Sequence, residues 1–208
     1  KGYMSADDLI RVDLNGNVVS GDKKPSSEMK MHLAVYKNRP DVKAVCHAHP
    51  QVATAFAVAR RICDKIALPE VIFSIGYVAM AEYATPTTEE VPNSIADIVK
   101  SADAILLANH GALTVGSDVF DAYYKMETLE HFAGITLYAR LLGGEVGLEP
   151  QQVSDLIKIR TEKYGKSDLG ALGDGFCGSR AVQEAGETDK IKNIVEQVVR
   201  ETLAKLKS

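Results

Sequence analysis

The sequence predicts a layered α/β domain, then a glycine-rich linker and a C-terminal amphipathic helix. Over residues 1–164, short apolar runs typical of strands alternate with longer segments of helical periodicity. Residues 165–187 contain six glycines and few large apolar side chains, which is typical of a flexible linker. Residues 188–208 place apolar side chains on one helical stripe opposite Lys, Glu and Arg. The stripe consists of Ile191, Ile194, Val195, Val198, Val199, Leu203 and Leu206.

Length, charge and apolar patterning exclude several classes of partner. The 208 residues suffice for one good-sized domain with an appendage. The net charge of −4 and the lack of a basic block argue against a nucleic-acid partner. No apolar run approaches the roughly 20 residues that span a bilayer, and residues 1–5 lack the apolar core of a signal peptide. Three scattered cysteines indicate a reduced, cytoplasmic protein, and we interpret Cys46 as a buried apolar residue.

Turn and capping residues delimit the elements expected in the first part of the chain. Alternating apolar residues and an Asn-Gly pair predict a hairpin over residues 9–20. Ser26 or Ser27 is typical of the N-cap of a helix that ends before Pro40. A strand and a helix are expected next, over residues 42–48 and about 51–60.

The same signals continue through the second part. Strand-like apolar pieces flank a glycine within residues 71–82. Thr87 and Glu90 have the spacing of a capping box, which predicts a helix to about residue 100. A strand over 104–109 follows, and residues 112–115 are expected to continue it. A helix capped by Asp118 and closed by Gly143-Gly144 is expected over about 118–142. A further helix is expected over about 150–164.

Three histidines carry the strongest functional signal. Side chains alternate along a strand, so His47 and His49 share one face. Burying both rings there would require partners for four nitrogens, and spacing alone favours a metal site and ordinary burial about equally. His110 ends a second apolar run before Gly111, where functional side chains collect. Three histidine ligands would leave a zinc-type ion one open position for substrate.

Glu28 and the two serines before it allow two interpretations. Glu28 could be a first-turn glutamate that interacts with the helix dipole, which contributes up to about 1 kcal/mol. It could also be a carboxylate near a metal that acts as general acid and base. Ser26 and Ser27 could donate hydrogen bonds to an anion at the helix N-terminus. Spacing alone favours the first interpretation of Glu28, although His32, four residues later, could support a site.

An ordered set of motifs resembles the class II aldolase/adducin family over residues 1 to about 164. The motifs are Lys24-Pro25-Ser26-Ser27-Glu28, Met31-His32-Leu33, Arg39-Pro40-Asp41-Val42, Val45-Cys46-His47-Ala48-His49-Pro50, Glu82-Tyr83-Ala84-Thr85 and Asn109-His110-Gly111-Ala112-Leu113. Together and in order they are far more specific than a His-x-His pair. The resemblance implies a three-layer α/β/α domain on a largely antiparallel sheet, assembled as a homotetramer with active sites between subunits.

The resemblance also implies an activity and a role for each site residue. In the family, the histidines that match His47, His49 and His110 hold a zinc ion. The glutamate that matches Glu28 also approaches the metal and serves as acid and base. The implied reaction is zinc-dependent retro-aldol cleavage of a deoxy-ketose 1-phosphate, such as L-fuculose 1-phosphate, to dihydroxyacetone phosphate and lactaldehyde. The serines that help bind the substrate phosphate match Ser26 and Ser27.

Two alternatives share the same motifs. An L-ribulose-5-phosphate 4-epimerase uses similar zinc chemistry but retains and re-adds the aldehyde fragment. A non-catalytic, adducin-like scaffold domain would have no need for a metal site. We also expect the family's N-terminal segment, with its glycine-rich phosphate loops, to be missing from these residues. The sugar-phosphate aldolases of the family carry a catalytic tyrosine near Glu70, where this chain has Leu-Pro-Glu-Val, so the proton donor to the leaving aldehyde is unassigned.

The C-terminal segment also allows two interpretations. The helix at 188–208 could dock on its own oligomer. A glycine-rich linker before a short amphipathic helix also resembles the encapsulation peptides that load enzymes into bacterial microcompartments. The apolar stripe would then bind a shell protein or a neighbouring helix, and we expect a cytoplasmic protein that resides inside such a compartment.

Overall fold

The computed structural model describes residues 3–63, 65–166 and 169. The chain divides into two compact units, of which the first, Lys1–Asp168, contains every described helix and strand. The predicted linker at 165–187 lies outside the described residues except at 165, 166 and 169, and the helix at 188–208 lies wholly outside them. Both of these elements therefore stay predictions.

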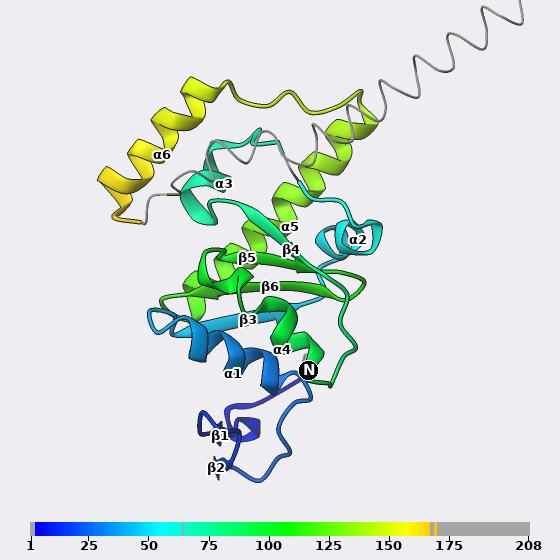
Figure 1. The fold of residues 1–208 in the computed structure, drawn as a ribbon, viewed down its shortest axis with the longest axis vertical. Coiled ribbons are helices and arrows are strands. Elements are labelled where there is room, and N and C mark those ends of the chain that lie inside the picture. Colours follow the sequence, from blue (N-terminus) through cyan, green and yellow to red (C-terminus); the bar gives the residue numbers. More distant parts are fainter. Residues whose placement is uncertain (1–2, 64, 167–168, 170–208) are drawn as a thin grey trace, which may run out of the picture. The chain divides into compact units, whose positions relative to one another are not determined.

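A four-stranded sheet forms the centre of the first unit, in the order β3-β6-β5-β4 (Figure 1). Strand β6 is antiparallel to both β3 and β5, whereas β4 is parallel to β5. The predicted largely antiparallel sheet is confirmed. Strands β3, β5 and β4 consequently run in one direction, and their carboxyl ends meet at one edge of the sheet. The strands are β3 (Ala44–Ala48), β4 (Val78–Ala81), β5 (Ala104–Leu107) and β6 (Gly111–Gly116), and a separate hairpin pairs β1 (Arg11–Val12) with β2 (Val18–Ser20).

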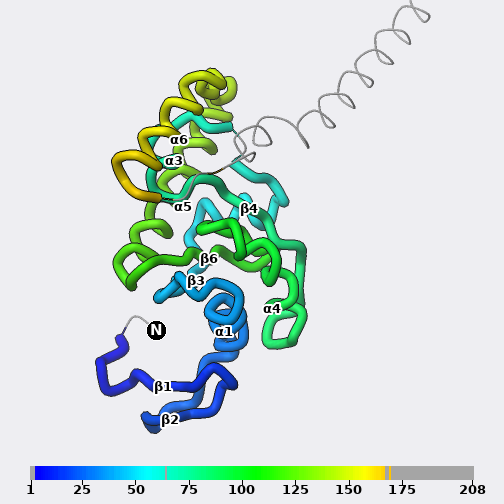
Figure 2. The backbone as a smooth tube through the Cα atoms, turned by 60° about the vertical axis from the view of Figure 1, so that its left-hand side comes forward, coloured from blue at the N-terminus to red at the C-terminus, as the bar shows by residue number. Residues whose placement is uncertain are grey.

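Helices cover both faces of this sheet, which confirms the three-layer α/β/α arrangement. Helices α2 and α5 pack on one face, while α1 and α4 contact each other on the opposite side (Figures 1 and 2). Helix α6 packs against α3. The helices are α1 (Met29–Asn38), α2 (Gln51–Ala59), α3 (Pro69–Ser74), α4 (Glu90–Ile95), α5 (Val119–Leu141) and α6 (Pro150–Tyr164), with 3₁₀ turns at Ala6–Asp8 and Ile98–Lys100.

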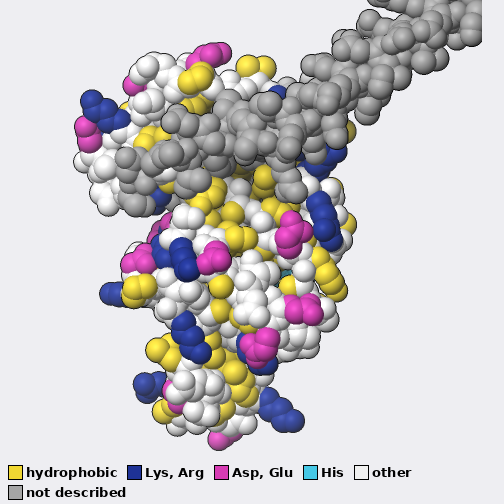
Figure 3. Space-filling model, in the orientation of Figure 1, with side chains coloured by type: hydrophobic (Ala, Val, Ile, Leu, Met, Phe, Trp, Pro, Cys, Tyr) yellow, Lys and Arg dark blue, Asp and Glu magenta, His cyan; other side chains and the backbone are white. Residues whose placement is uncertain are grey.

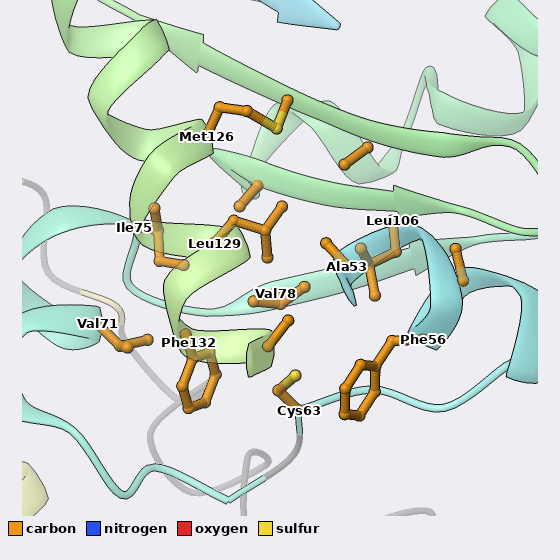
Figure 4. Packing of buried hydrophobic residues seen from close by; sticks show 14 residues of the cluster. Ala53, Phe56, Cys63, Val71, Ile75, Val78, Leu106, Met126, Leu129 and Phe132 are labelled. Carbon is orange, nitrogen blue, oxygen red and sulfur yellow. The ribbon is translucent and has the colours of Figure 1, made fainter. Parts of the chain in front are cut away.

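The main hydrophobic core lies between the sheet and helices α2 and α5 (Figure 4). Leu129 and Phe132 of α5 meet Leu106 of β5 and Phe56 of α2 in this core. Cys46 packs against the same cluster and is partly buried, in place of the full burial we expected. Because side chains alternate along a strand, the neighbouring His47 faces the opposite side of the sheet, toward the layer of α1 and α4.

Several expected boundaries were wrong for local reasons. The apolar run before Gly76 forms helix α3, because Pro69 occupies the first helical position, where its missing N–H costs nothing. Helix α1 has Glu28 as its N-cap, and the Ser26 hydroxyl instead accepts a hydrogen bond from the Glu28 N–H at 3.2 Å. The Thr87–Glu90 box does not form, since the Glu90 carboxylate accepts from the Thr85 N–H at 2.8 Å.

The surface of the described residues is mixed in charge. Basic and acidic side chains are interspersed on the face drawn in Figure 3. Within the described part of the chain, no helix combines the length and the apolar character that a membrane crossing requires.

Candidate metal centre

Strand β3 and the residue after it supply two of the three histidines. His47 lies opposite Leu113 in the antiparallel pairing of β3 with β6. His49 follows one residue after the end of β3 and is exposed, whereas His47 is partly buried. The alternation of the strand thus places both rings on the side of the sheet away from the main core, as the sequence predicted.

A tight turn between β5 and β6 supplies the third histidine. The sequence suggested that residues 112–115 continue the preceding strand, but the chain reverses so that Leu107 pairs with Gly111. Asn109 adopts a left-handed conformation with φ 57°, which asparagine tolerates better than most residues. The reversal places His110 at the edge where β3 and β5 end. An Asn before His-Gly was the signal for this turn.

The three imidazole rings converge on one point. One nitrogen atom from each ring can be chosen so that all three lie within 4.8 Å of one another. The ring centroids are 4.9–5.1 Å apart, and the ring planes are inclined at 63–72° to one another. Rings that face a common centre at such angles can direct three lone pairs to one ion, so this donor set fits a zinc-type metal.

The hydrogen bond of His47 determines which of its nitrogens is available to a metal. Its Nδ1 lies 2.9 Å from the carbonyl oxygen of Ala112. A carbonyl can only accept, so Nδ1 carries the hydrogen and Nε2 keeps its lone pair. Histidines that bind a metal through one nitrogen are usually oriented by such a hydrogen bond from the other nitrogen.

The same environment favours the uncharged form of His47 and His110. Burial lowers the pKa of His47 to about 4, with smaller contributions from the nearby His110 and His49. Burial also lowers the pKa of His110, against an opposing effect of the negative charge of Glu28. Neutral imidazoles at physiological pH are the form that binds a metal.

Gly111 leaves the space in which the His49 ring lies. A Cβ atom at this position would approach the His49 Cδ2 atom to 2.5 Å and the Ala48 carbonyl oxygen to 2.7 Å. Any larger residue would displace either the ring or the backbone of β3. From the sequence alone, Gly111 was identifiable only as the residue that follows His110.

Glu28 and the two serines precede helix α1, and they are not among the clustered ligand atoms. Among the residues that the structure describes, the potential ligands within 4.8 Å of one another are His47, His49 and His110, without Glu28. The negative charge of Glu28 nevertheless raises the pKa of His110, against the larger effect of burial. Ser26 and Ser27 are exposed in the turn before α1.

Comparison with known proteins now identifies the family. The model for the class II aldolase and adducin N-terminal domain matches residues 1–137. The chain belongs to this family. An L-fuculose phosphate aldolase of Methanococcus maripaludis is 36% identical over 132 residues, which cover 64% of this chain and 71% of that protein. A 3-oxo-tetronate 4-phosphate decarboxylase of Haemophilus influenzae is 32% identical over 160 residues, 74% of this chain and 75% of its own.

Solved structures agree with this assignment. An L-fuculose 1-phosphate aldolase superimposes with a TM-score of 0.71 and 33% identity, covering 79% of this chain and 76% of that one. Family membership and the histidine group together identify the chain as a metal-dependent aldolase, which is a carbon–carbon lyase.

Proposed function

We propose that this class II aldolase uses zinc to cleave a deoxy-ketose 1-phosphate, of the L-fuculose 1-phosphate type, to dihydroxyacetone phosphate and lactaldehyde. The convergence of three imidazoles at the sheet edge carries the proposal. Three neutral ligands leave an ion its full charge and an open position for a substrate oxygen. Similarity to L-fuculose phosphate aldolases supports the substrate class.

His47, His49 and His110 would hold the ion, and Glu28 would move the proton. A bound zinc ion would supply positive charge that stabilises the negative charge developing on the substrate's carbonyl oxygen when the carbon–carbon bond breaks. Glu28 delivers a proton to the carbon that keeps the electron pair, which completes dihydroxyacetone phosphate. The exposed hydroxyls that would bind the substrate phosphate are those of Ser26 and Ser27.

The test is release of dihydroxyacetone phosphate from L-fuculose 1-phosphate, followed by a coupled NADH assay. We expect release that stops after treatment with a chelator and returns with stoichiometric zinc. Release that survives complete metal removal would contradict the proposal. An epimerase would instead convert L-ribulose 5-phosphate to its epimer without free dihydroxyacetone phosphate, and a scaffold domain would purify without metal.

A second candidate reaction is decarboxylation of a 3-oxo-tetronate 4-phosphate. One relative with this activity, from Haemophilus influenzae, matches 160 residues of the chain, whereas the Methanococcus maripaludis aldolase matches 132. The chain also has Leu-Pro-Glu-Val near Glu70, where family aldolases carry the tyrosine that exchanges a proton with the aldehyde. Carbon dioxide leaves without such a proton transfer. Both substrates are assayed at the same enzyme and substrate concentrations, and the rates of carbon dioxide and lactaldehyde release are measured separately. The faster reaction decides between the candidates.

Assembly and location are proposed on sequence grounds. We propose a homotetramer with active sites between subunits, to be tested by light scattering. We also propose that residues 188–208 bind a microcompartment shell protein and load the enzyme into such a compartment. If deletion of 188–208 leaves co-sedimentation with shells unchanged, this assignment is wrong.

A further inference from the structure

The first turn of helix α2 is capped by a side chain from another helix. Pro50 is the N-cap residue of α2 and offers no side-chain acceptor. The Glu130 carboxylate of α5 takes over this function: its Oε1 accepts from the Val52 N–H at 2.8 Å, and its Oε2 accepts from the Ala53 N–H at 2.7 Å. These two amides are those that an N-cap side chain normally satisfies.

This contact is stronger than an ordinary cap. The acceptor carries a full negative charge, and it faces the positive end of the helix dipole. Its oxygens also reach two successive amides, which restricts the direction of the first turn. Glu130 is partly buried, and its neighbour Leu129 is fully buried in the core, so α5 presents the carboxylate from a rigid position.

The capped turn is directly connected to a histidine of the metal centre. Strand β3 pairs with β6 up to Ala48, and α2 begins at Gln51. Only His49 and Pro50 lie between these two fixed points, and proline restricts the backbone further. The position of the His49 ring therefore depends on where the first turn of α2 is held.

The other end of α2 is hydrogen-bonded to Asn109, the residue before the third histidine. The Asn109 N–H donates to the Ala57 carbonyl of α2 at 3.2 Å, and the Asn109 side chain accepts from Arg60 at 3.0 Å. Asn109 immediately precedes His110. Helix α2 thus connects the two turns that carry His49 and His110, and a shift at its start alters their separation.

We propose that Glu130 is a positioning residue of the metal centre, which fixes His49 by holding the first turn of α2. The inference rests on the proposed metal site. A purely structural cap would stabilise the fold without changing how a folded molecule binds metal. A positioning residue changes the metal affinity and the coordination of molecules that remain folded, because the metal tolerates ligand displacements of only about 0.2 Å.

The experiment compares Glu130→Ala and Glu130→Gln with wild type and with Glu127→Gln. Glu127 is exposed on the same helix and contacts the Tyr123 hydroxyl, so it is a matched control. Zinc affinity is measured by competition with a chromogenic chelator. The absorption of Co²⁺-substituted protein reports the coordination geometry. Both are recorded well below the melting temperature of each apoprotein, determined by circular dichroism.

We expect Glu130→Ala to weaken zinc binding about 10- to 100-fold, the range found for residues that support a ligand, and to change the Co²⁺ spectrum. Glu130→Gln keeps one acceptor oxygen and should fall between alanine and wild type, which also supplies the test if the alanine variant does not fold. Folded variants with a lower melting temperature but wild-type affinity and spectrum would overturn the positioning role alone. Wild-type protein that takes up neither metal would overturn the metal site as well.

Discussion

Replacement of Gly111 by alanine tests the geometry of the metal centre with a single methyl group. The added carbon would lie 2.5 Å from the His49 ring and 2.7 Å from the Ala48 carbonyl oxygen. The carbonyl belongs to the last pair of the β3–β6 ladder, so it yields less readily than the ring of an exposed histidine. We therefore expect the ring to move.

The magnitude follows from these distances. The 2.5 Å separation falls about 0.9 Å short of the 3.4 Å at which ordinary contacts begin, several times the roughly 0.2 Å that metal–ligand bonds tolerate. His49 should cease to coordinate, which should weaken zinc binding by about 100-fold or more, at or beyond the upper end of the loss caused by removing a supporting contact. Overpacking should cost about 1–3 kcal/mol of folding free energy in addition.

Two other glycines separate these effects. A Cβ atom at Gly116, at the far end of the same strand, would lie 2.4 Å from the Ala122 nitrogen. Gly116→Ala should therefore destabilise the fold, while the folded fraction binds zinc normally. Gly134 in α5 has nothing within 4 Å, so alanine there should stabilise the helix by about 0.5–1 kcal/mol. Zinc titration and urea unfolding of all three variants test this reasoning, and wild-type zinc affinity in Gly111→Ala would refute it.

Three further predictions concern charged groups. Glu28→Gln should lower kcat by about 10²–10⁴-fold with unchanged zinc content; loss of zinc would show that Glu28 is a ligand. Burial would raise the pKa of Asp121, but hydrogen bonds from Ser117 and the charge of Lys125 hold it below the ordinary 3.8. The ionised Asp121 therefore stabilises the fold above pH 3.8, and this stabilisation is lost as the pH falls through its lowered pKa. Asp121→Asn should cost about 1 kcal/mol of unfolding free energy at pH 7 and less at pH 3, as measured by urea unfolding. Lys125 is 5% exposed and pairs with Asp103 at 2.9 Å, so Lys125→Met should cost about 3 kcal/mol; a change under 1 kcal/mol would contradict a buried pair.

Local signals in the sequence predicted the elements whose ends are marked by strong caps or turns. The Asp118 side chain caps α5 through the Asp121 N–H at 2.8 Å, as predicted. The hairpin at the Asn-Gly pair also forms. Elements that depend on tertiary contacts were misjudged. Strand-like apolar residues at 71–74 are helical: Pro69 begins the helix, and Val71 then packs into the core beside α5, a contact that no local pattern indicates.

The site was predictable to the extent that it depends on periodicity. The alternation of a strand placed His47 and His49 on one face, and the motif order added His110. The supporting groups were not predictable, because they are contributed by tertiary contacts across long sequence separations. Glu130 lies 77 residues from Ala53, and no local pattern distinguishes it from the exposed Glu127 of the same helix.

The two candidate reactions place different demands on the same centre. Each breaks a carbon–carbon bond next to the ketone of a phosphorylated compound, and each leaves the enediolate of dihydroxyacetone phosphate. In the proposed mechanism the histidines and Glu28 would serve this shared fragment, so they would not discriminate between the substrates. The departing fragments differ: an aldehyde must exchange a proton at its oxygen, whereas carbon dioxide must not. Residues near Glu70 lack the tyrosine that performs this exchange in family aldolases. The ratio of kcat/KM for the two substrates therefore measures whether another group of the protein handles that proton.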